Sequence, residues 1–169
     1  MFLSTLGFDG VDGAYRSIEI RGPEGTLAEA WKDGPSTLYG VSVASFPNLC
    51  SIMGPEAVFT NILPSIELQG DFIVKLIKEA NRRDARSPSV EADAKAQVQW
   101  WATVQAVSKA TVFDKVKSWL QNDNVKVKAK YSAFFLAGLH NYRARLEEEE
   151  RGEYQLFVFT EEQMLGRTS

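Results

Sequence analysis

The chain has 169 residues, 44% of them hydrophobic, which suits one globular domain that buries a sizeable core. Its 19 basic and 22 acidic residues give a net charge of −3 and are scattered, so the basic stripe that a nucleic-acid partner requires is absent. One cysteine excludes an intramolecular disulfide framework, and no stretch reaches the roughly 20 apolar residues of a membrane span, so we expect a cytoplasmic protein with no membrane partner.

The first part of the chain is predicted to form short strands and turns. Residues 2–6 and 17–21 have the apolar content of short strands, and a strand at the very first residue suggests a domain cut from a longer one. Thr26, with Glu29 three residues later, is the pattern of a capping box at the start of a short helix over residues 27–32.

Two further strands are expected before the first long helix. The apolar runs 38–43 and 49–53 are too short for helices and flank a turn at residues 45–48. Cys50 lies in the second run and is interpreted as a core residue without a chemical role, because no basic residue adjoins it to activate the thiol.

Two long amphipathic helices are predicted in the middle of the chain. The first runs from Pro64 to about Arg83, and the second covers residues 89–114. The residues expected to face the core are Ile66, Ile73, Leu76 and Ile77 on the first helix, and Ala94, Val98, Trp101, Val104, Val107 and Val112 on the second.

The C-terminal part is expected to contain a loop, a helix and a strand. Residues 118–130 are polar and lysine-rich and predict a loop, residues 140–151 predict a helix with an acidic, solvated face, and residues 154–159 alternate as a strand. The fold class is therefore α+β: a single domain over residues 1–169 in which a small β-sheet packs with two long amphipathic helices and a C-terminal helix plus strand.

The sequence lacks the short motifs of common cofactor and catalytic sites. No Gly-x-Gly-x-x-Gly follows a predicted strand, and there is no phosphate loop, Gly-x-Ser-x-Gly elbow or His-Glu-x-x-His. One histidine and one cysteine cannot build the usual zinc set. We therefore expect neither a cofactor nor a metal in this chain, and hydrolase and metalloenzyme functions are disfavoured.

A few residues have side chains suited to a small-molecule site. Residues 54–64 could line an apolar cavity and present the hydroxyl of Thr60 and the amide of Asn61; the alternative is a plain connector in which Asn61 caps the next helix. Trp119 lies in a polar loop and is a candidate for a ligand pocket. His140 could act as a general acid or base, and the alternative is an ordinary surface histidine near a helix start.

A series of segments spread along the chain matches, in order, the pattern of one known family. The segments are Gly7-Phe-Asp-Gly-Val-Asp-Gly-Ala-Tyr-Arg, Trp31-Lys-Asp-Gly-Pro-Ser-Thr-Leu-Tyr-Gly-Val, Phe46-Pro-Asn-Leu, Met53-Gly-Pro, Phe59-Thr-Asn-Ile-Leu-Pro-Ser-Ile-Glu, Ser118-Trp119 and Leu136-Ala-Gly-Leu-x-x-Tyr-Arg. They resemble the cyclohexanone-monooxygenase-like Baeyer–Villiger enzymes, which are flavin-containing monooxygenases. The likeness covers nearly the whole chain, and a colinear series is more specific than a lone motif.

The resemblance implies a place for this sequence within such an enzyme. In that family the portion after Gly-Phe-Asp completes the FAD domain and supplies part of the ketone pocket and of the loop that closes over NADPH. By resemblance, Phe59, Thr60 and Ile62 line the substrate side, Trp119 sits in the closing loop, and Phe134 lies near the same cavity. The two nucleotide-binding fingerprints, the family signature and the arginine that steadies the flavin peroxide are missing from this sequence, so we do not expect an oxygenase by itself.

Departures from the family pattern indicate relaxed selection for contact with flavin and NADPH. The family loop reads Ser-Trp-x-x-Gly-Ala-Asn-Ile-Pro-Gly-Lys, and residues with ordinary backbone preferences replace its glycines and proline here. The departures are Asn122, Lys126 and Val127 in the loop, Leu6 in place of the threonine before Gly-Phe-Asp, and Glu56 and Val58 in the Gly-Pro-x-x-Pro turn.

These observations lead to a functional hypothesis of a cofactor-independent enzyme of secondary metabolism. It would use the inherited hydrophobic pocket for a non-redox cyclisation of a hydrophobic small molecule, an intramolecular Diels–Alder cycloaddition being the most economical version. Such a reaction can proceed through orientation of the substrate, and one hydrogen bond to a carbonyl would lower the barrier further. Phe59, Ile62, Trp119 and Phe134 would shape the pocket, Thr60, Asn61 or Tyr131 would donate the hydrogen bond, and His140 is a further catalytic candidate.

The alternative function is a non-catalytic one, in which the chain is a ligand-binding or docking remnant of a split flavin monooxygenase. A domain without its flavin-binding neighbour exposes apolar surface, which usually needs a partner. We therefore expect self-association as a homodimer.

Overall fold

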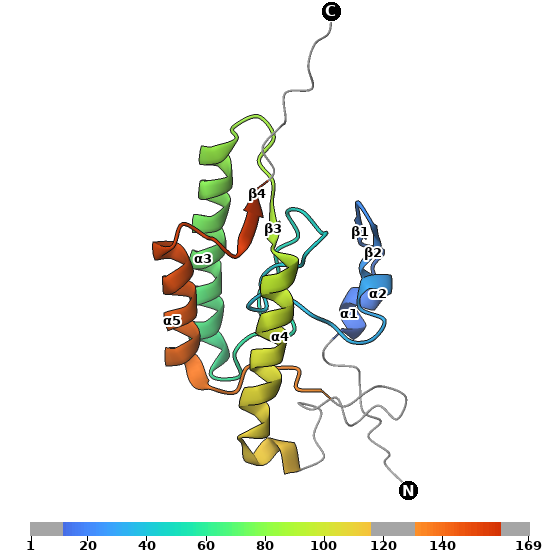
Figure 1. Cartoon of the computed structure of the whole chain (residues 1–169), viewed down its shortest axis with the longest axis vertical. Coiled ribbons are helices and arrows are strands. Elements are labelled where there is room, and N and C mark those ends of the chain that lie inside the picture. The colour runs from blue at the N-terminus through green and yellow to red at the C-terminus, as the bar shows by residue number, and fades with distance from the viewer. Residues whose placement is uncertain (1–11, 116–130, 160–169) are drawn as a thin grey trace, which may run out of the picture.

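The computed structural model describes residues 12–115 and 131–159, and these residues form the expected α+β fold (Figure 1). The three longest of the described helices are α3 (Ile62–Arg83), α4 (Ala94–Lys109) and α5 (Gly138–Arg151), and α3 and α5 lie side by side in Figure 1. The shorter elements are α1 (Gly13–Arg16), β1 (Arg21–Gly22), β2 (Gly25–Thr26), α2 (Leu27–Ala30), β3 (Val90–Ala92), the 3-10 helix η1 (Val112–Lys115) and β4 (Phe157–Phe159).

The described strands form two small antiparallel sheets. β1 pairs with β2, and β3 pairs with β4 with Glu91 opposite Val158. β4 confirms the C-terminal strand, although it covers only the last three residues of the expected range. The strand expected at residues 2–6 and the loop expected at 118–130 lie outside the described residues.

The strands predicted at residues 38–43 and 49–53 are wrong. Only isolated bridges form there, from Leu38 to Ser42 and from Ser42 to Cys50. Left-handed backbone at Tyr39 (φ 60°) and Met53 (φ 56°) bends these runs out of an extended conformation. The strand expected at residues 17–21 is likewise reduced to its last residue, which begins β1.

Helix α3 matches the predicted helix closely, and part of its predicted core face is confirmed, because Leu76 is buried and Ile73 packs against the core. Asn61 caps its start, because Asn61 Oδ1 accepts a hydrogen bond from Leu63 N–H (3.3 Å). Leu76 is fully buried as expected, whereas Ile66 and Ile77 are exposed. The buried row consists mainly of residues four apart, namely Ser65, Gln69, Phe72, Leu76 and Ala80.

The second long helix starts later than expected, and its predicted core face is only partly confirmed, because Val104 is fully buried and Val107 packs against the core. The first residues of the range form β3, and Asp93 caps α4 instead. Trp101 is 41% exposed, whereas Trp100 is buried, because its ring packs against Tyr39 and Phe135 at centroid distances of 4.8 Å. The buried row is Ala96, Trp100, Val104 and Ser108, and Val98 and Val112 of the predicted stripe are exposed.

A buried polar link joins α3, α5 and the loop that precedes α3. The Gln69 carboxamide donates hydrogen bonds to Tyr142 Oη (2.7 Å) and to the Tyr39 carbonyl (3.3 Å), and its Oε1 accepts one from Met53 N–H (2.7 Å). The Tyr142 hydroxyl also donates to the Tyr39 carbonyl. Since Gln69 and Tyr142 are fully buried, these bonds replace the water that each group loses on folding.

The capping box predicted before α2 is confirmed and gives a first testable prediction. Thr26 Oγ1 accepts from Glu29 N–H (3.3 Å), and Glu29 Oε2 accepts from Thr26 N–H (2.9 Å). We expect Thr26→Ala to lower the free energy of unfolding in urea by about 1 kcal/mol. In the control Thr103→Ala, a residue inside α4 whose hydroxyl bonds only the Gln99 carbonyl, no loss is expected; equal losses in both variants would contradict the capping role.

Candidate functional site

Two segments far apart in the sequence form a short parallel ladder that places the candidate site. Glu56 N–H donates to Ala133 O (2.7 Å), Phe135 N–H donates to Ala57 O (2.9 Å), and Phe59 N–H donates to Phe135 O (3.0 Å). One segment leads into α3 and the other into α5. The residues just before the two helices are therefore held together by backbone bonds.

The ladder brings two of the predicted substrate-binding residues into contact. The ring of Phe59 lies 5.7 Å from that of Phe134 and 6.4 Å from that of Phe113, measured between centroids. We call these three residues the phenylalanine cluster. Phe113 comes from η1, beyond the end of α4, and sequence reasoning missed it because only this long-range packing gives it a role.

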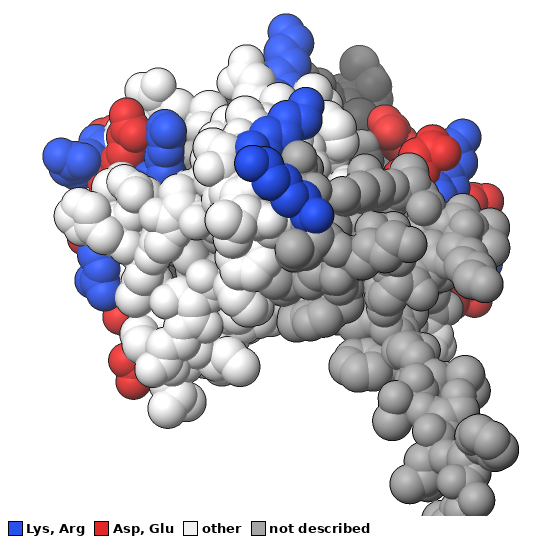
Figure 2. Space-filling model, turned by 90° about the horizontal axis from the view of Figure 1, so that it is seen from below, with Lys and Arg blue, Asp and Glu red and all other residues white. Residues whose placement is uncertain are grey.

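The cluster lies at the end of the molecule where α3 and α5 begin. Phe59 is 40% exposed, and Ile62, the first residue of α3, is 58% exposed. Figure 2 views the molecule from this lower side, where a broad area of the described surface carries no charged side chains. Apolar side chains at this end are thus open to a ligand or to another part of a protein.

The polar residues predicted to be catalytic do not gather at one place in the structure. Thr60 is half-buried beside the cluster residue Phe59, and Asn61 caps α3 as the structural alternative proposed. Tyr131 is buried, with its ring 3.2 Å from where a Cβ on Gly34 would lie. His140 is exposed in the first turn of α5, and Trp119 lies outside the described residues.

A buried carboxyl group close to the cluster was not predicted as a site residue. Glu56 is 1% exposed; its Oε2 accepts hydrogen bonds from Thr37 N–H (2.8 Å) and the Thr37 hydroxyl (3.3 Å), whereas its Oε1 has no partner. Burial raises the pKa of Glu56 to about 8. The departure from the family turn was visible in the sequence, but the burial of the carboxyl group depends on Thr37, 19 residues away.

Comparison with known proteins identifies the relatives of this chain. No family model matches it. Over 159 residues it is 39% identical to a phenazine N-monooxygenase of Lysobacter antibioticus, and over 144 residues it is 37% identical to cyclohexanone 1,2-monooxygenase of Acinetobacter sp.. The fold of cyclohexanone monooxygenase from Rhodococcus sp. Phi1, bound to NADP+, matches 91% of the chain with a TM-score of 0.86 and 37% identity.

The chain is a homologue of part of the Baeyer–Villiger monooxygenases. The match to the phenazine N-monooxygenase spans 94% of this chain but only 29% of that protein. The match to the Acinetobacter enzyme spans 85% of this chain but only 26% of that enzyme. The structural match likewise covers 29% of the Rhodococcus chain. The resemblance inferred from the sequence motifs is therefore confirmed.

Among the described helices, none is both long enough and apolar enough to cross a membrane.

Two glycines that precede α3 pack closely against other atoms of the chain. A Cβ at Gly40 would lie 2.6 Å from Ala57 Cβ, and one at Gly54 would lie 2.6 Å from the Gly40 carbonyl. The chain's own atoms thus fill the space beside both glycines. Among the described residues there is also no group of three metal-ligating side chains.

Proposed function

We propose that this chain forms the substrate-side wall of a Baeyer–Villiger-type flavin monooxygenase, in which other residues hold FAD and NADPH. The observation that carries the proposal is the ladder that sets Phe59 against Phe134, with Phe59 and Ile62 open to solvent. An apolar wall that is open on one side is what one half of a shared pocket requires.

The residues of this wall would bind and orient the substrate. The cluster rings and Ile62 would cover the hydrocarbon part of a cyclic ketone, and each fully covered side chain contributes about 1.5–3 kcal/mol. Thr60 could donate a hydrogen bond to the ketone oxygen from beside Phe59. The chemistry of oxygen insertion would come from the flavin and the residues that hold it.

A second candidate function is the cofactor-independent cyclisation, including an intramolecular Diels–Alder cycloaddition. Such a reaction would use the same apolar surface to orient the substrate and would need no redox group. The exposure of Phe59 and Ile62 favours the first proposal, because orientation of a flexible substrate needs a pocket closed on several sides. A docking remnant of a split monooxygenase would use the same open surface.

The first proposal is tested in a chimera of cyclohexanone monooxygenase from Acinetobacter, in which this chain replaces the aligned part. We expect Phe59→Ala to lower kcat/KM for a cyclic ketone about 30-fold, corresponding to about 2 kcal/mol of lost apolar contact. Val158→Ala, which trims an exposed apolar side chain on β4, is the matched control and should leave kcat/KM unchanged. Equal kcat/KM for the Phe59 variant and the parent chimera would remove Phe59 from the substrate wall.

We also propose that the isolated chain forms a homodimer through this apolar end. Its location would be the cytoplasm, and its substrate would be a hydrophobic small molecule. The exposure of Ile62 and Leu63 supports the proposal. Light scattering on the purified chain measures its mass, and a monomer at all concentrations would contradict the dimer.

A further inference from the structure

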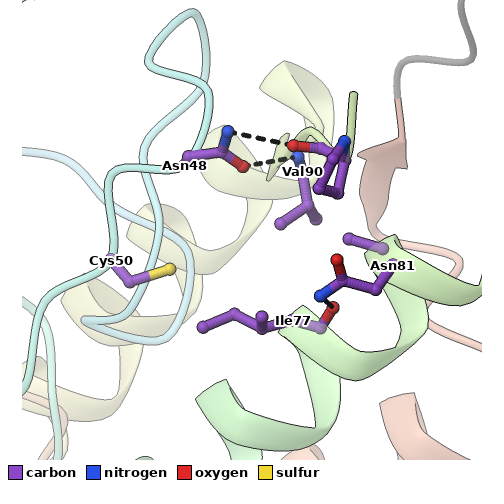
Figure 3. A pocket seen from close by; sticks show the side chains of 7 residues that line it. Asn48, Cys50, Ile77, Asn81 and Val90 are labelled. Atoms are coloured by element: carbon purple, nitrogen blue, oxygen red, sulfur yellow. Dashed lines mark hydrogen bonds between the residues drawn. The ribbon is translucent and has the colours of Figure 1, made fainter. Parts of the chain in front are cut away.

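A small hollow lies between α3 and the segment that leads into β3 (Figure 3). Its volume is about 260 Å³. For comparison, an apolar protein cavity of about 150 Å³ is large enough to hold benzene. The residues that line it are Asn48, Cys50, Ile77, Ala80, Asn81, Pro88 and Val90.

Asn48 holds the rim of this hollow in place. Its Nδ2 donates to the Pro88 carbonyl (3.2 Å) and its Oδ1 accepts from Val90 N–H (3.1 Å), as Figure 3 shows. The backbone N–H of Asn48 also donates to the Val90 carbonyl (2.8 Å). Because Val90 is paired with β4 and the floor is a long helix, the hollow exists before any ligand enters, and binding costs little ordering entropy.

The lining favours a neutral, mostly apolar molecule. None of the seven lining residues carries a charge, and Cys50, Ile77, Ala80, Pro88 and Val90 present apolar or weakly polar groups. Burial raises the pKa of the Cys50 thiol, so it stays uncharged near neutral pH. Among polar atoms, Asn81 Nδ2 already donates to the Ile77 carbonyl (2.8 Å), which leaves Asn81 Oδ1 as an acceptor for one donor on a ligand.

The hollow is distinct from the phenylalanine cluster. Ile62 begins α3 beside the cluster, whereas Ile77 lies 15 residues further along the same helix. Because an α-helix rises about 1.5 Å per residue, the two isoleucines are about 22 Å apart along the axis of α3. A ligand in the hollow therefore does not occupy the substrate wall proposed above.

We propose that this hollow is a second binding site, for a neutral molecule of one or two rings that carries a hydroxyl group, such as a phenol. The rings fill the apolar space between Ile77 and Val90, and the hydroxyl donates to Asn81 Oδ1. The site stands independently of the proposed monooxygenase function.

Cys50 is the sole cysteine of the sequence and reports directly on this site. The rate of its reaction with methyl methanethiosulfonate is measured on the 169-residue chain with increasing phenol, or with benzoate as the charged counterpart. We expect phenol to slow the reaction saturably, by about fivefold or more, and benzoate to have little effect. No protection by phenol, or equal protection by benzoate, would overturn the proposal.

Two substitutions on the exposed side of α3 sharpen the test. Ile77→Phe fills the hollow from the α3 side and should abolish protection by phenol, whereas Val74→Phe, one turn earlier and outside the lining, should leave it unchanged. As a second measurement that does not need the thiol, phenol should raise the melting temperature of the parent chain and not that of Cys50→Phe. Persistent protection in Ile77→Phe would place the phenol elsewhere.

Discussion

Replacing Gln69 with leucine is expected to lower the free energy of unfolding by about 3 kcal/mol. The substitution keeps the apolar bulk but removes all three hydrogen bonds of the carboxamide. Met53 N–H then loses its acceptor, and the Tyr142 hydroxyl loses one donor within the core. Urea unfolding followed by circular dichroism measures the difference.

Gln99→Leu is the matched control for this prediction. Gln99 is exposed on α4, so the same chemical change should shift the free energy of unfolding by less than about 0.5 kcal/mol. If both variants unfold at the same urea concentration, the buried link around Gln69 does not stabilise the fold as argued.

Glu56→Gln is expected to stabilise the protein increasingly as the pH rises. The pKa of Glu56 is about 8 in the folded chain and near 4.5 for an ordinary glutamate, so the folded state retains a proton that the unfolded state releases. The contribution of Glu56 to the free energy of unfolding is fully present below pH 4.5 and is lost as the pH rises through 8. The difference between the two pKa values sets an upper limit of about 5 kcal/mol on what this group contributes to the free energy of unfolding.

The glutamine variant removes this dependence and retains an acceptor for Thr37 N–H. We expect it to equal the parent chain near pH 4.5 and to exceed its free energy of unfolding by about 3 kcal/mol at pH 8. Urea unfolding at both pH values provides the comparison, with Glu67→Gln on the exposed side of α3 as the control. A parent chain with the same pH slope as Glu56→Gln would show that Glu56 is ionised in the folded state.

Local sequence signals predicted the helices better than the strands. The capping box at Thr26 and the start of α3 at Asn61 depend on side chains within a few residues of each other, and the sequence shows both partners. The expected strands at 38–43 and 49–53 failed because non-glycine residues there adopt left-handed backbone, which their residue types disfavour. The choice of Trp100 over Trp101 for the core depends on rings from distant segments.

The candidate site was reached through the family resemblance more than through residue patterns. The resemblance implied that Phe59 and Phe134 lie near the same cavity, and in the structure their ring centroids are 5.7 Å apart. The parallel ladder that brings these rings together pairs Val58 with Phe135, 77 residues further along the chain, which no local periodicity reveals. Phe113 and the buried carboxyl of Glu56 depend on the same long-range packing, so sequence reasoning missed both.

Product analysis of the chimera with cyclohexanone monooxygenase tests the substrate-wall proposal most directly. With FAD and NADPH, a chimera that carries this chain is expected to convert a cyclic ketone into a product one oxygen atom heavier, as detected by mass spectrometry. A chimera whose absorbance confirms full flavin loading but which forms no oxygenated product would contradict the proposal. Conversion of a substrate by the isolated chain into an isomer of unchanged mass would support cyclisation instead.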